Sequence, residues 1–365
     1  MTHRIHNFGA GPGALPLAVL EQAQRELVDF QGSGLSILEA SHRGPMYEAV
    51  HARTIEVLRE LLDPGRGLPD HDVLFMSGGA RTQFAAIPMN LLPAGGSADY
   101  LVTGVWSEMA VKEAQKLGTA REAYSSAANS HDHVPAAGAY TVDPNAAYFH
   151  YTSNNTIFGT QFDHVPDTGD VPLVGDLSSD ILSRPLDAQR FGLIYAGAQK
   201  NIGAAGVTLV VVRRDLLARC PKHLPDTLNY AKVAKENSLL NTPPVFAIYL
   251  VGLVAQHLLD HGGAAAAAVR NEAKATLLYG AIDRSGGFYQ GHAQPASRSK
   301  MNVTFRLGSE ELTKAFLGEA QAAGMEGLKG HRSVGGLRAS IYNAVELASV
   351  RALVDLMDDF ARRHG

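Results

Sequence analysis

The chain has 365 residues, 45% hydrophobic and 19% charged, and is therefore long enough for a large core and two domains. Its formal net charge of −4 excludes a general attraction to nucleic acid or to an anionic membrane. Cys220 is the single cysteine, so no internal disulfide can form. Because the first residues are polar and no apolar run reaches about 20 residues, we expect a cytoplasmic protein without a signal peptide or a membrane span.

Glycines recur in residues 7–13, a feature shared with dinucleotide-binding loops. No strand precedes these glycines and Pro12 interrupts them, so we interpret residues 1–15 as an extended arm. Residues 16–29 follow with apolar side chains at helical spacing and predict the first helix. A second amphipathic helix is predicted from about Met46 to Leu62.

His42 and Arg43 lie next to each other in the loop before this second helix. Charged loop residues are mostly exposed, so a purely solvated pair is one interpretation. The planar fork of an arginine also suits a carboxylate or a phosphate, which makes an anion-binding pair the other interpretation. The two residues alone do not decide between these possibilities.

A predicted strand over residues 72–76 is followed by Gly78 and Gly79, and then by Ala80 and Arg81 at the start of a helix. Free amides at a helix N-terminus bind anions, and the helix dipole favours the negative charge. The segment lacks the Gly-Lys-Ser/Thr of a P-loop. A phosphate-binding turn and an ordinary tight turn between a strand and a helix both stay open.

Trp106, the single tryptophan, follows a predicted strand over residues 100–103. Just past the carboxyl end of a strand, a tryptophan can stack on a planar heterocycle, although a core tryptophan would have the same pattern. A further predicted strand, over residues 146–151, leads to a short polar segment that contains Thr156.

Residues 125–139 are polar, rich in Ala and Gly and without periodicity, and they predict a surface excursion. His131, Asp132 and His133 are residue types that bind metals, but no further ligand follows at a recognisable spacing. We therefore expect a solvated loop here and no metal site.

The strongest signal is a lysine that follows a buried strand. Residues 191–197 are dense in aromatic and β-branched side chains, end at a glycine and lead to Lys200. Burial lowers the pKa of a lysine and frees its amine for Schiff-base chemistry with an aldehyde, although most lysines extend into water. An earlier apolar strand ends at Asp176, and a carboxylate and a lysine at two strand ends suit pyridoxal phosphate. A Schiff-base aldolase without a cofactor is an alternative.

The segment Ile194–Asn201 resembles the lysine segment of the phosphoserine aminotransferases, a branch of the fold-type I pyridoxal-phosphate enzymes. Residues 330–332 and 335–340 resemble the same family, and the resemblance extends from Asn7 to Gly365. Strands that alternate with helices, with polar residues after the strands, are typical of a doubly wound sheet that binds its ligand beyond the carboxyl ends.

The fold class that the resemblance implies is α/β, with a mainly parallel, doubly wound sheet in a large domain and a small C-terminal α/β domain. We expect the large cofactor-binding domain over residues 16–261 and the small domain over residues 262–365, with a pair of glycines at the hinge. The small domain is predicted to contain a half-buried strand over residues 301–307 and a closing helix whose apolar face begins at Leu347.

The resemblance also implies the site. Lys200 and Asp176 are the implied catalytic pair: Lys200 carries pyridoxal 5′-phosphate and acts as a general base, and Asp176 keeps the pyridine nitrogen protonated. The implied cofactor-binding residues are Ala80, Arg81, Trp106, Thr156, Asp176, Gln199 and Lys200, with Asn241 and Thr242 from the neighbouring subunit of a homodimer. The implied substrate-binding residues are His42, Arg43, His331 and Arg332 at a phosphate, and Arg338 at the α-carboxylate.

The implied reaction is a ping-pong transamination in serine biosynthesis, from L-glutamate and 3-phosphohydroxypyruvate to 2-oxoglutarate and O-phospho-L-serine. Use of 3-hydroxy-2-oxo-4-phosphobutanoate in pyridoxine biosynthesis is left open. Gly9, Ala80 and Asn155 depart from the family pattern, which commonly has Ser, Gly and Glu at these positions. The alternatives are another fold-type I enzyme, of the glyoxylate aminotransferase or cysteine desulfurase type, and a protein that binds the cofactor without catalysis.

Overall fold

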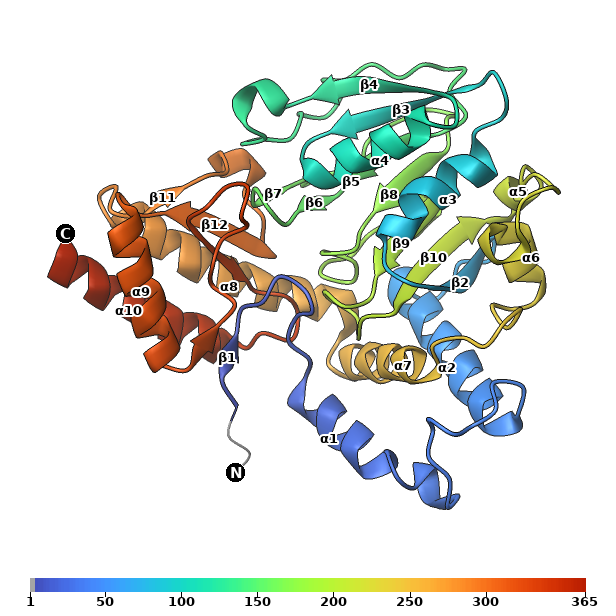
Figure 1. The fold of residues 1–365 in the computed structure, drawn as a ribbon, viewed down its shortest axis with the longest axis horizontal. Coiled ribbons are helices and arrows are strands. Elements are labelled where there is room, and N and C mark those ends of the chain that lie inside the picture. Colours follow the sequence, from blue (N-terminus) through green and yellow to red (C-terminus); the bar gives the residue numbers. More distant parts are fainter. Residues whose placement is uncertain (1–3) are drawn as a thin grey trace.

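The computed structural model describes residues 4–365. Its larger part is built on a seven-stranded sheet, with the spatial order β2 (His71–Ser77), β10 (Val207–Arg213), β9 (Phe191–Gly197), β8 (Leu173–Asp176), β5 (Phe149–Thr152), β3 (Ser97–Val102) and β4 (Thr119–Ser125). The strands from β9 to β4 pair in parallel, whereas β10 is antiparallel to both of its neighbours. The predicted mainly parallel sheet is therefore confirmed (Figure 1).

Helices cover both faces of this sheet. The helices on one face are α3 (Arg81–Leu91) and α4 (Val105–Gln115), and those on the other are α2 (Pro45–Leu62) and α7 (Val245–Asp260). Successive side chains of a strand point to opposite faces, so Leu193 and Tyr195 join one core while Ile194 and Ala196 join the other. Because both faces are buried, the central strands are continuous apolar runs, as is typical of parallel sheets.

The helix bounds differ slightly from the predicted ones. The first helix, α1 (Leu17–Glu26), ends before the predicted Asp29, and two short helices, α5 (Arg214–Leu217) and α6 (Tyr230–Lys235), were not predicted. Within residues 4–365, no helix taken singly has both the length and the apolar composition to cross a membrane. Only α7 and α8 (Gly263–Arg284) together meet that criterion, with a bend of 83° between them.

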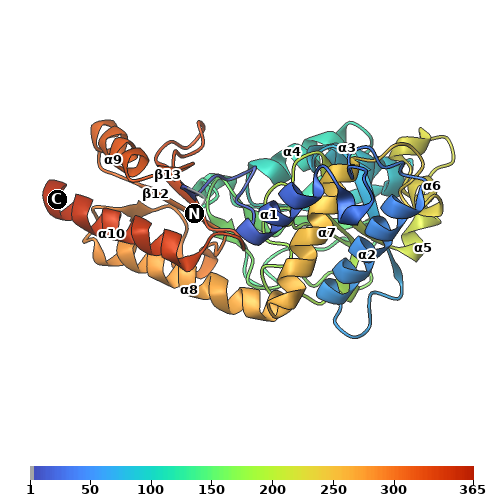
Figure 2. The same cartoon turned by 90° about the horizontal axis from the view of Figure 1, so that it is seen from below.

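The helix α8 leads from α7 into the smaller part of the molecule (Figure 2). This part contains α9 (Glu310–Ala322), α10 (Leu347–His364) and a three-stranded sheet with the order β11 (Gln290–Gly291), β12 (Asn302–Arg306) and β14 (Leu337–Ser340). These elements enclose a core of their own, to which α10 contributes Val350, Leu353 and Met357. Leu347 is 39% exposed, because it begins the helix ahead of the turn that packs on this core. The residue bounds of the two domains stay a prediction.

The N-terminal segment runs along both parts. Its strand β1 (His6–Asn7) pairs in parallel with β13 (Met325–Glu326) of the smaller part. Further along, a Cβ added at Gly13 would lie 2.7 Å from Lys200 O, so the chain passes here at a distance that only glycine permits. Residues 1–3 of the predicted arm lie outside the described residues.

Candidate active site

The segments that carry most of the predicted site residues meet at one edge of the large sheet. The strands β2, β3, β5, β8 and β9 run in the same direction, so their carboxyl ends lie along this edge. The predicted residues found there are Ala80 and Arg81 after β2, Trp106 after β3, Thr156 after β5, Asp176 at the end of β8, and Gln199 and Lys200 after β9.

Lys200 is half-buried, and its Nζ lies 5.3 Å from the centroid of the Trp106 ring. Burial lowers the pKa of Lys200; the Asp176 carboxylate opposes this shift, and the Arg338 guanidinium adds to it. A lowered pKa increases the fraction of free amine near neutral pH, which is the form that reacts with an aldehyde. The fold thus brings a lysine of lowered pKa against an aromatic face.

Asp176 is 6% exposed and is held by its neighbour Ser178. Its Oδ1 accepts hydrogen bonds from Ser178 N (3.0 Å) and from Ser178 Oγ (2.6 Å). The same Ser178 Oγ accepts a hydrogen bond from Gly197 N (3.0 Å), at the end of β9. One hydroxyl therefore fixes the carboxylate and links the two strand ends that carry Asp176 and the segment of Lys200.

The turn between β2 and α3 is suited to an anion. Gly78 has a φ of +98°, and Thr208 Oγ1 donates a hydrogen bond to its carbonyl (3.0 Å). No side chain caps the N-terminus of α3 at Ala80, and Thr82 N and Gln83 N donate to Gly79 O and Ala80 O (3.0 and 2.9 Å), so within the described chain the amides of Ala80 and Arg81 are the ones left for a ligand. A Cβ added at Gly197 would lie 3.3 Å from Ala80 Cβ, which shows how closely the end of β9 approaches this turn.

Trp106 and Thr156 form a continuous wall beside Lys200. Trp106 Nε1 donates a hydrogen bond to Thr156 Oγ1 (3.0 Å). Behind this wall, Asn155 Nδ2 donates to Thr103 Oγ1 (3.1 Å), and a Cβ added at Gly104 would lie 2.5 Å from Asn155 Oδ1. Asn155, which departs from the family pattern, is thus a buried brace between the segments that carry Trp106 and Thr156.

The residues at this edge fit pyridoxal phosphate. Gln199 Oε1 is buried without a hydrogen-bond partner in the described chain, although buried polar atoms are nearly always paired. A ligand with polar groups would supply the missing partner. The reactive amine of Lys200, the fixed carboxylate of Asp176 and the uncapped amides of α3 match the aldehyde, the ring nitrogen and the phosphate of this cofactor.

Arg338 and His331 approach the same region from the smaller part of the molecule. Arg338, on β14, is half-buried, and its Nη1 donates a hydrogen bond to Thr156 O (3.0 Å). Its Nε is buried without a partner in the described chain. Burial, together with Arg338 and Arg332, lowers the pKa of His331. Arg338, His331 and Arg332 therefore lie near one another, and of these three Arg338 is the one that acts on the pKa of Lys200.

Four predicted residues do not join this group in the single chain. His42 and Arg43 precede α2, and Asn241 and Thr242 precede α7. The two helices pack side by side, and within residues 4–365 no hydrogen bond or ion pair joins His42, Arg43, Asn241 or Thr242 to the residues of this group. Arg43, Asn241 and Thr242 are exposed. One chain therefore does not bring His42 and Arg43 together with His331 and Arg332, the four residues predicted at the substrate phosphate.

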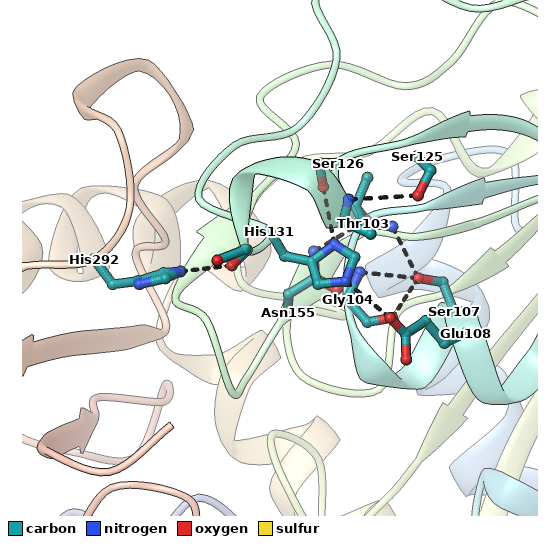
Figure 3. A network of polar contacts seen from close by, with 11 residues as sticks. Thr103, Gly104, Ser107, Glu108, Ser125, Ser126, His131, Asn155 and His292 are labelled. Atoms are coloured by element: carbon teal, nitrogen blue, oxygen red, sulfur yellow. Dashed lines mark hydrogen bonds and ion pairs between the residues drawn. The ribbon is translucent and has the colours of Figure 1, made fainter. Parts of the chain in front are cut away.

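The prediction of a solvated loop is wrong for His131. This side chain is 5% exposed, and its ring nitrogens lie 3.0 Å from Ser126 Oγ and 3.0 Å from Glu108 Oε1 (Figure 3). A polar segment without periodicity gives no signal for such burial, because the partners come from other elements. Sequence reasoning also missed Ser178, for which the only signal is a serine two positions after Asp176.

Comparison with known proteins identifies the family of the chain. The family model "Aminotransferase class-V" matches residues 5–353. A phosphoserine aminotransferase from Lysinibacillus sphaericus is 53% identical over 100% of both chains, and one from Geobacillus kaustophilus is 55% identical over 99% of both. The solved phosphoserine aminotransferase from Bacillus circulans subsp. alkalophilus has a TM-score of 0.97 at 54% identity, over 100% of both chains. The chain therefore belongs to the class-V aminotransferase family, on its phosphoserine aminotransferase branch.

Proposed function

We propose that the chain is a pyridoxal-phosphate-dependent aminotransferase that converts 3-phosphohydroxypyruvate and L-glutamate to O-phospho-L-serine and 2-oxoglutarate. The observation that carries the proposal is Lys200, an amine of lowered pKa above the Trp106 ring, at the edge where Asp176 ends its strand. The activity named for the similar proteins supports the choice of substrates.

Asp176 and Lys200 have different tasks in this reaction. When bound, pyridoxal phosphate supplies an electron sink that stabilises negative charge at the substrate Cα. Asp176, oriented by Ser178, keeps the positive charge of the ring nitrogen in place. Lys200 Nζ takes the proton from the substrate Cα and delivers it again, because its lowered pKa suits both steps near neutral pH.

Arg338 is the proposed partner of the substrate α-carboxylate. Its bond to Thr156 O fixes the guanidinium while leaving other N–H groups free, and an arginine fork binds a carboxylate with two parallel bonds. His331 and Arg332, on the adjacent loop, are the proposed donors to the distal anion. That anion is the phosphate of one substrate and the γ-carboxylate of the other, and basic donors accept both.

A homodimer completes this assignment. Within residues 4–365, no hydrogen bond or ion pair joins His42 or Arg43 to Arg338, or Asn241 or Thr242 to the first turn of α3. We propose that a second copy brings the first pair to the substrate phosphate and the second pair to the cofactor phosphate. The cytoplasmic location and the use of the pyridoxine-pathway substrate stay predictions.

A mixture of two inactive variants tests the shared site. Lys200→Ala and Arg43→Ala chains, unfolded together and refolded, form mixed dimers in which one site has both wild-type residues. If Arg43 acts on the partner's site, the mixture regains up to about half of the wild-type activity per mixed dimer, as independent sites require. If each chain uses its own Arg43, the mixture shows no more activity than the two variants measured separately.

The rival chemistries have weaker support. A cysteine desulfurase needs a reactive thiol, but burial raises the pKa of the Cys220 thiol, and this residue packs against the core beneath α3 and α4. The single carboxylate of glyoxylate would bind Arg338, so a glyoxylate aminotransferase would have no distal anion for His331 and Arg332 to bind. A protein that only holds the cofactor would not need a general base of lowered pKa.

Absorption spectroscopy of the purified protein tests the proposed function. L-glutamate should remove the absorption band of the bound cofactor, and 3-phosphohydroxypyruvate should restore it. Glyoxylate serves as the matched acceptor without a phosphate and should restore the band far more slowly. A band that responds to neither L-glutamate nor 3-phosphohydroxypyruvate would refute the proposal, and equal rates with glyoxylate would refute the choice of acceptor.

A further inference from the structure

Residues 126–134, which we call the crossing loop, connect the large sheet to the smaller part of the molecule. At the start of the loop, Ser126 N donates a hydrogen bond to Val102 O (3.1 Å), at the end of β3. At its far end, Val134 N donates to Ser297 Oγ (3.1 Å), beyond β11. The crossing loop is therefore anchored on both sides.

His131 is the buried centre of the crossing loop. Its φ is +54° and that of Ser130 is +53°, although residues other than glycine seldom adopt this left-handed conformation. Two such residues in succession persist only where the surroundings hold them. The ring supplies that hold, since Glu108 Oε1 accepts a hydrogen bond from Nε2 (3.0 Å) and Nδ1 lies 3.0 Å from Ser126 Oγ (Figure 3).

Glu108 transmits this contact to Trp106. Both residues lie in the first turns of α4, whose start is fixed by Ser107 Oγ through hydrogen bonds from the backbone amides before the helix. The hydrogen bond from His131 to Glu108 therefore helps to fix the orientation of the helix turn that carries Trp106. Trp106 in turn donates to Thr156 Oγ1 and lies under Lys200 Nζ.

Phe158 transmits a second contact to Thr156, which lies two residues earlier in the chain. The Phe158 ring contacts two imidazoles in tilted geometry, with its centroid 5.0 Å from that of His131 and 5.5 Å from that of His292. His292 Nε2 donates a hydrogen bond to Ser130 O (2.9 Å), which anchors the crossing loop next to these rings. His131 thus contacts the supports of both Trp106 and Thr156.

We propose that His131 is a positioning residue that fixes Trp106 and Thr156 relative to each other, and so sets the wall on which the cofactor ring rests. The inference rests on the proposed function only in that Trp106 and Thr156 face the cofactor. No contact joins His131 to Lys200 in the described chain, so its effect passes through Glu108 and Phe158.

Tryptophan fluorescence gives a direct readout, because Trp106 is the single tryptophan of the chain. His131→Asn removes the ring but keeps a residue that tolerates the left-handed backbone. In the cofactor-free protein, we expect a shifted Trp106 emission and stronger quenching by acrylamide. In the loaded protein, the dissociation constant of the cofactor should rise about tenfold, because a displaced wall no longer matches the ring.

Variants of two further residues separate positioning from a general loss of stability. Glu108→Ala should reproduce the effects of His131→Asn, whereas Glu108→Gln keeps an acceptor for His131 Nε2 and should remain close to the wild type. His133→Asn is the matched control, because His133 lies in the same loop but bonds to Asp132 and Tyr124 (2.6 and 2.7 Å). It should leave the Trp106 emission and the cofactor affinity unchanged.

The proposal fails if folded His131→Asn and Glu108→Ala proteins both keep the wild-type emission, quenching and cofactor affinity, even with a lower melting temperature. If His131→Asn does not fold, Glu108→Ala decides alone, since its side chain is 34% exposed and its loss creates no cavity. The emission is measured without substrate. A failure of the proposed substrates would therefore leave this result intact, and the two failures are distinguishable.

Discussion

Lys200 and Lys274 lie in different parts of the molecule, and burial lowers the pKa of each, that of Lys274 to about 7. Lys274, on α8, is 1% exposed and donates hydrogen bonds to Ile341 O (2.8 Å) and Tyr342 O (2.7 Å). Lys200 Nζ makes no hydrogen bond within residues 4–365 and lies over the Trp106 ring. Burial is common to both lysines, so it does not identify the reactive one.

The difference lies in what surrounds the amine. Both bonds of Lys274 end on the carbonyls that follow β14, so this lysine links α8 to the strand that carries Arg338. Lys200 follows β9 at the sheet edge where a carboxylate, an aromatic ring and uncapped amides meet. A buried lysine with satisfied donors is a structural link, and one without partners at such an edge is free to react.

The largest expected effect separates the two lysines. Lys200→Ala should lower kcat about 10⁴-fold, because it removes both the covalent attachment and the general base. Lys274→Met should keep kcat within about tenfold, since it shifts Arg338 only indirectly. Steady-state kinetics with L-glutamate and 3-phosphohydroxypyruvate measure both. A folded Lys274→Met protein as inactive as Lys200→Ala would contradict the distinction.

Two buried carboxylates extend the comparison. Asp176→Asn should lower kcat about 100-fold, because asparagine keeps the size of the side chain but not the charge opposite the ring nitrogen. Asp180→Asn is the matched control: burial raises the pKa of Asp180, and this side chain accepts hydrogen bonds from Ser153 and Gln161. Its kcat should stay within about threefold of the wild type. Similar losses in the two variants would contradict the role of Asp176.

A smaller effect separates the two substrates. Arg332→Ala should raise KM for O-phospho-L-serine about tenfold and KM for L-glutamate less than about twofold, because a phosphate dianion depends more strongly on a second cation. Single-turnover measurements of each half-reaction give the two values. Arg351→Ala, on the exposed face of α10, is the control and should change neither. Equal losses on both substrates would show that Arg332 does not select phosphate.

The last prediction concerns stability instead of activity, and its effect depends on pH. Lys274 has a pKa of about 7 in the folded chain against 10.5 when unfolded, so folding between these pH values releases a proton. Releasing this proton costs free energy and destabilises the folded chain. The cost is absent above the unfolded pKa, grows as the pH falls and reaches its full size below about pH 7. The free energy of unfolding should therefore rise with pH in this window, by at most about 1.4 kcal/mol per unit. Urea denaturation at several pH values measures this free energy, and Lys274→Met should lack the rise. If the free energy of unfolding changes with pH equally in the wild type and in Lys274→Met, the prediction is wrong.

The sequence predicted the strand ends of the site well. Residues 191–197 and the strand before Asp176 are short apolar runs that end at polar residues, so periodicity and glycines were enough to place Lys200 and Asp176. Contacts between distant segments left no such signal. Nothing in an alanine-rich helix marks Lys274, and nothing in a polar loop marks His131. These side chains are buried by partners from other elements, which a local pattern does not contain.

The sequence also could not show whether one chain or two chains supply the residues that bind the substrate phosphate, for a different reason. The spacing of His42, Arg43, His331 and Arg332 along the chain does not report whether one chain or two bring them together. Within residues 4–365 no hydrogen bond or ion pair joins the two pairs, and this lack of contact is the physical basis for proposing a second copy.

Borohydride reduction of the loaded enzyme, followed by proteolysis and mass spectrometry of the peptides, tests the central claim most directly. Reduction makes a bond between an amine and an aldehyde permanent. We predict that the cofactor mass is found on Lys200 and on no other lysine. A label on Lys274 or on any other residue, or no label at all, would contradict the assignment of Lys200 as the reactive amine.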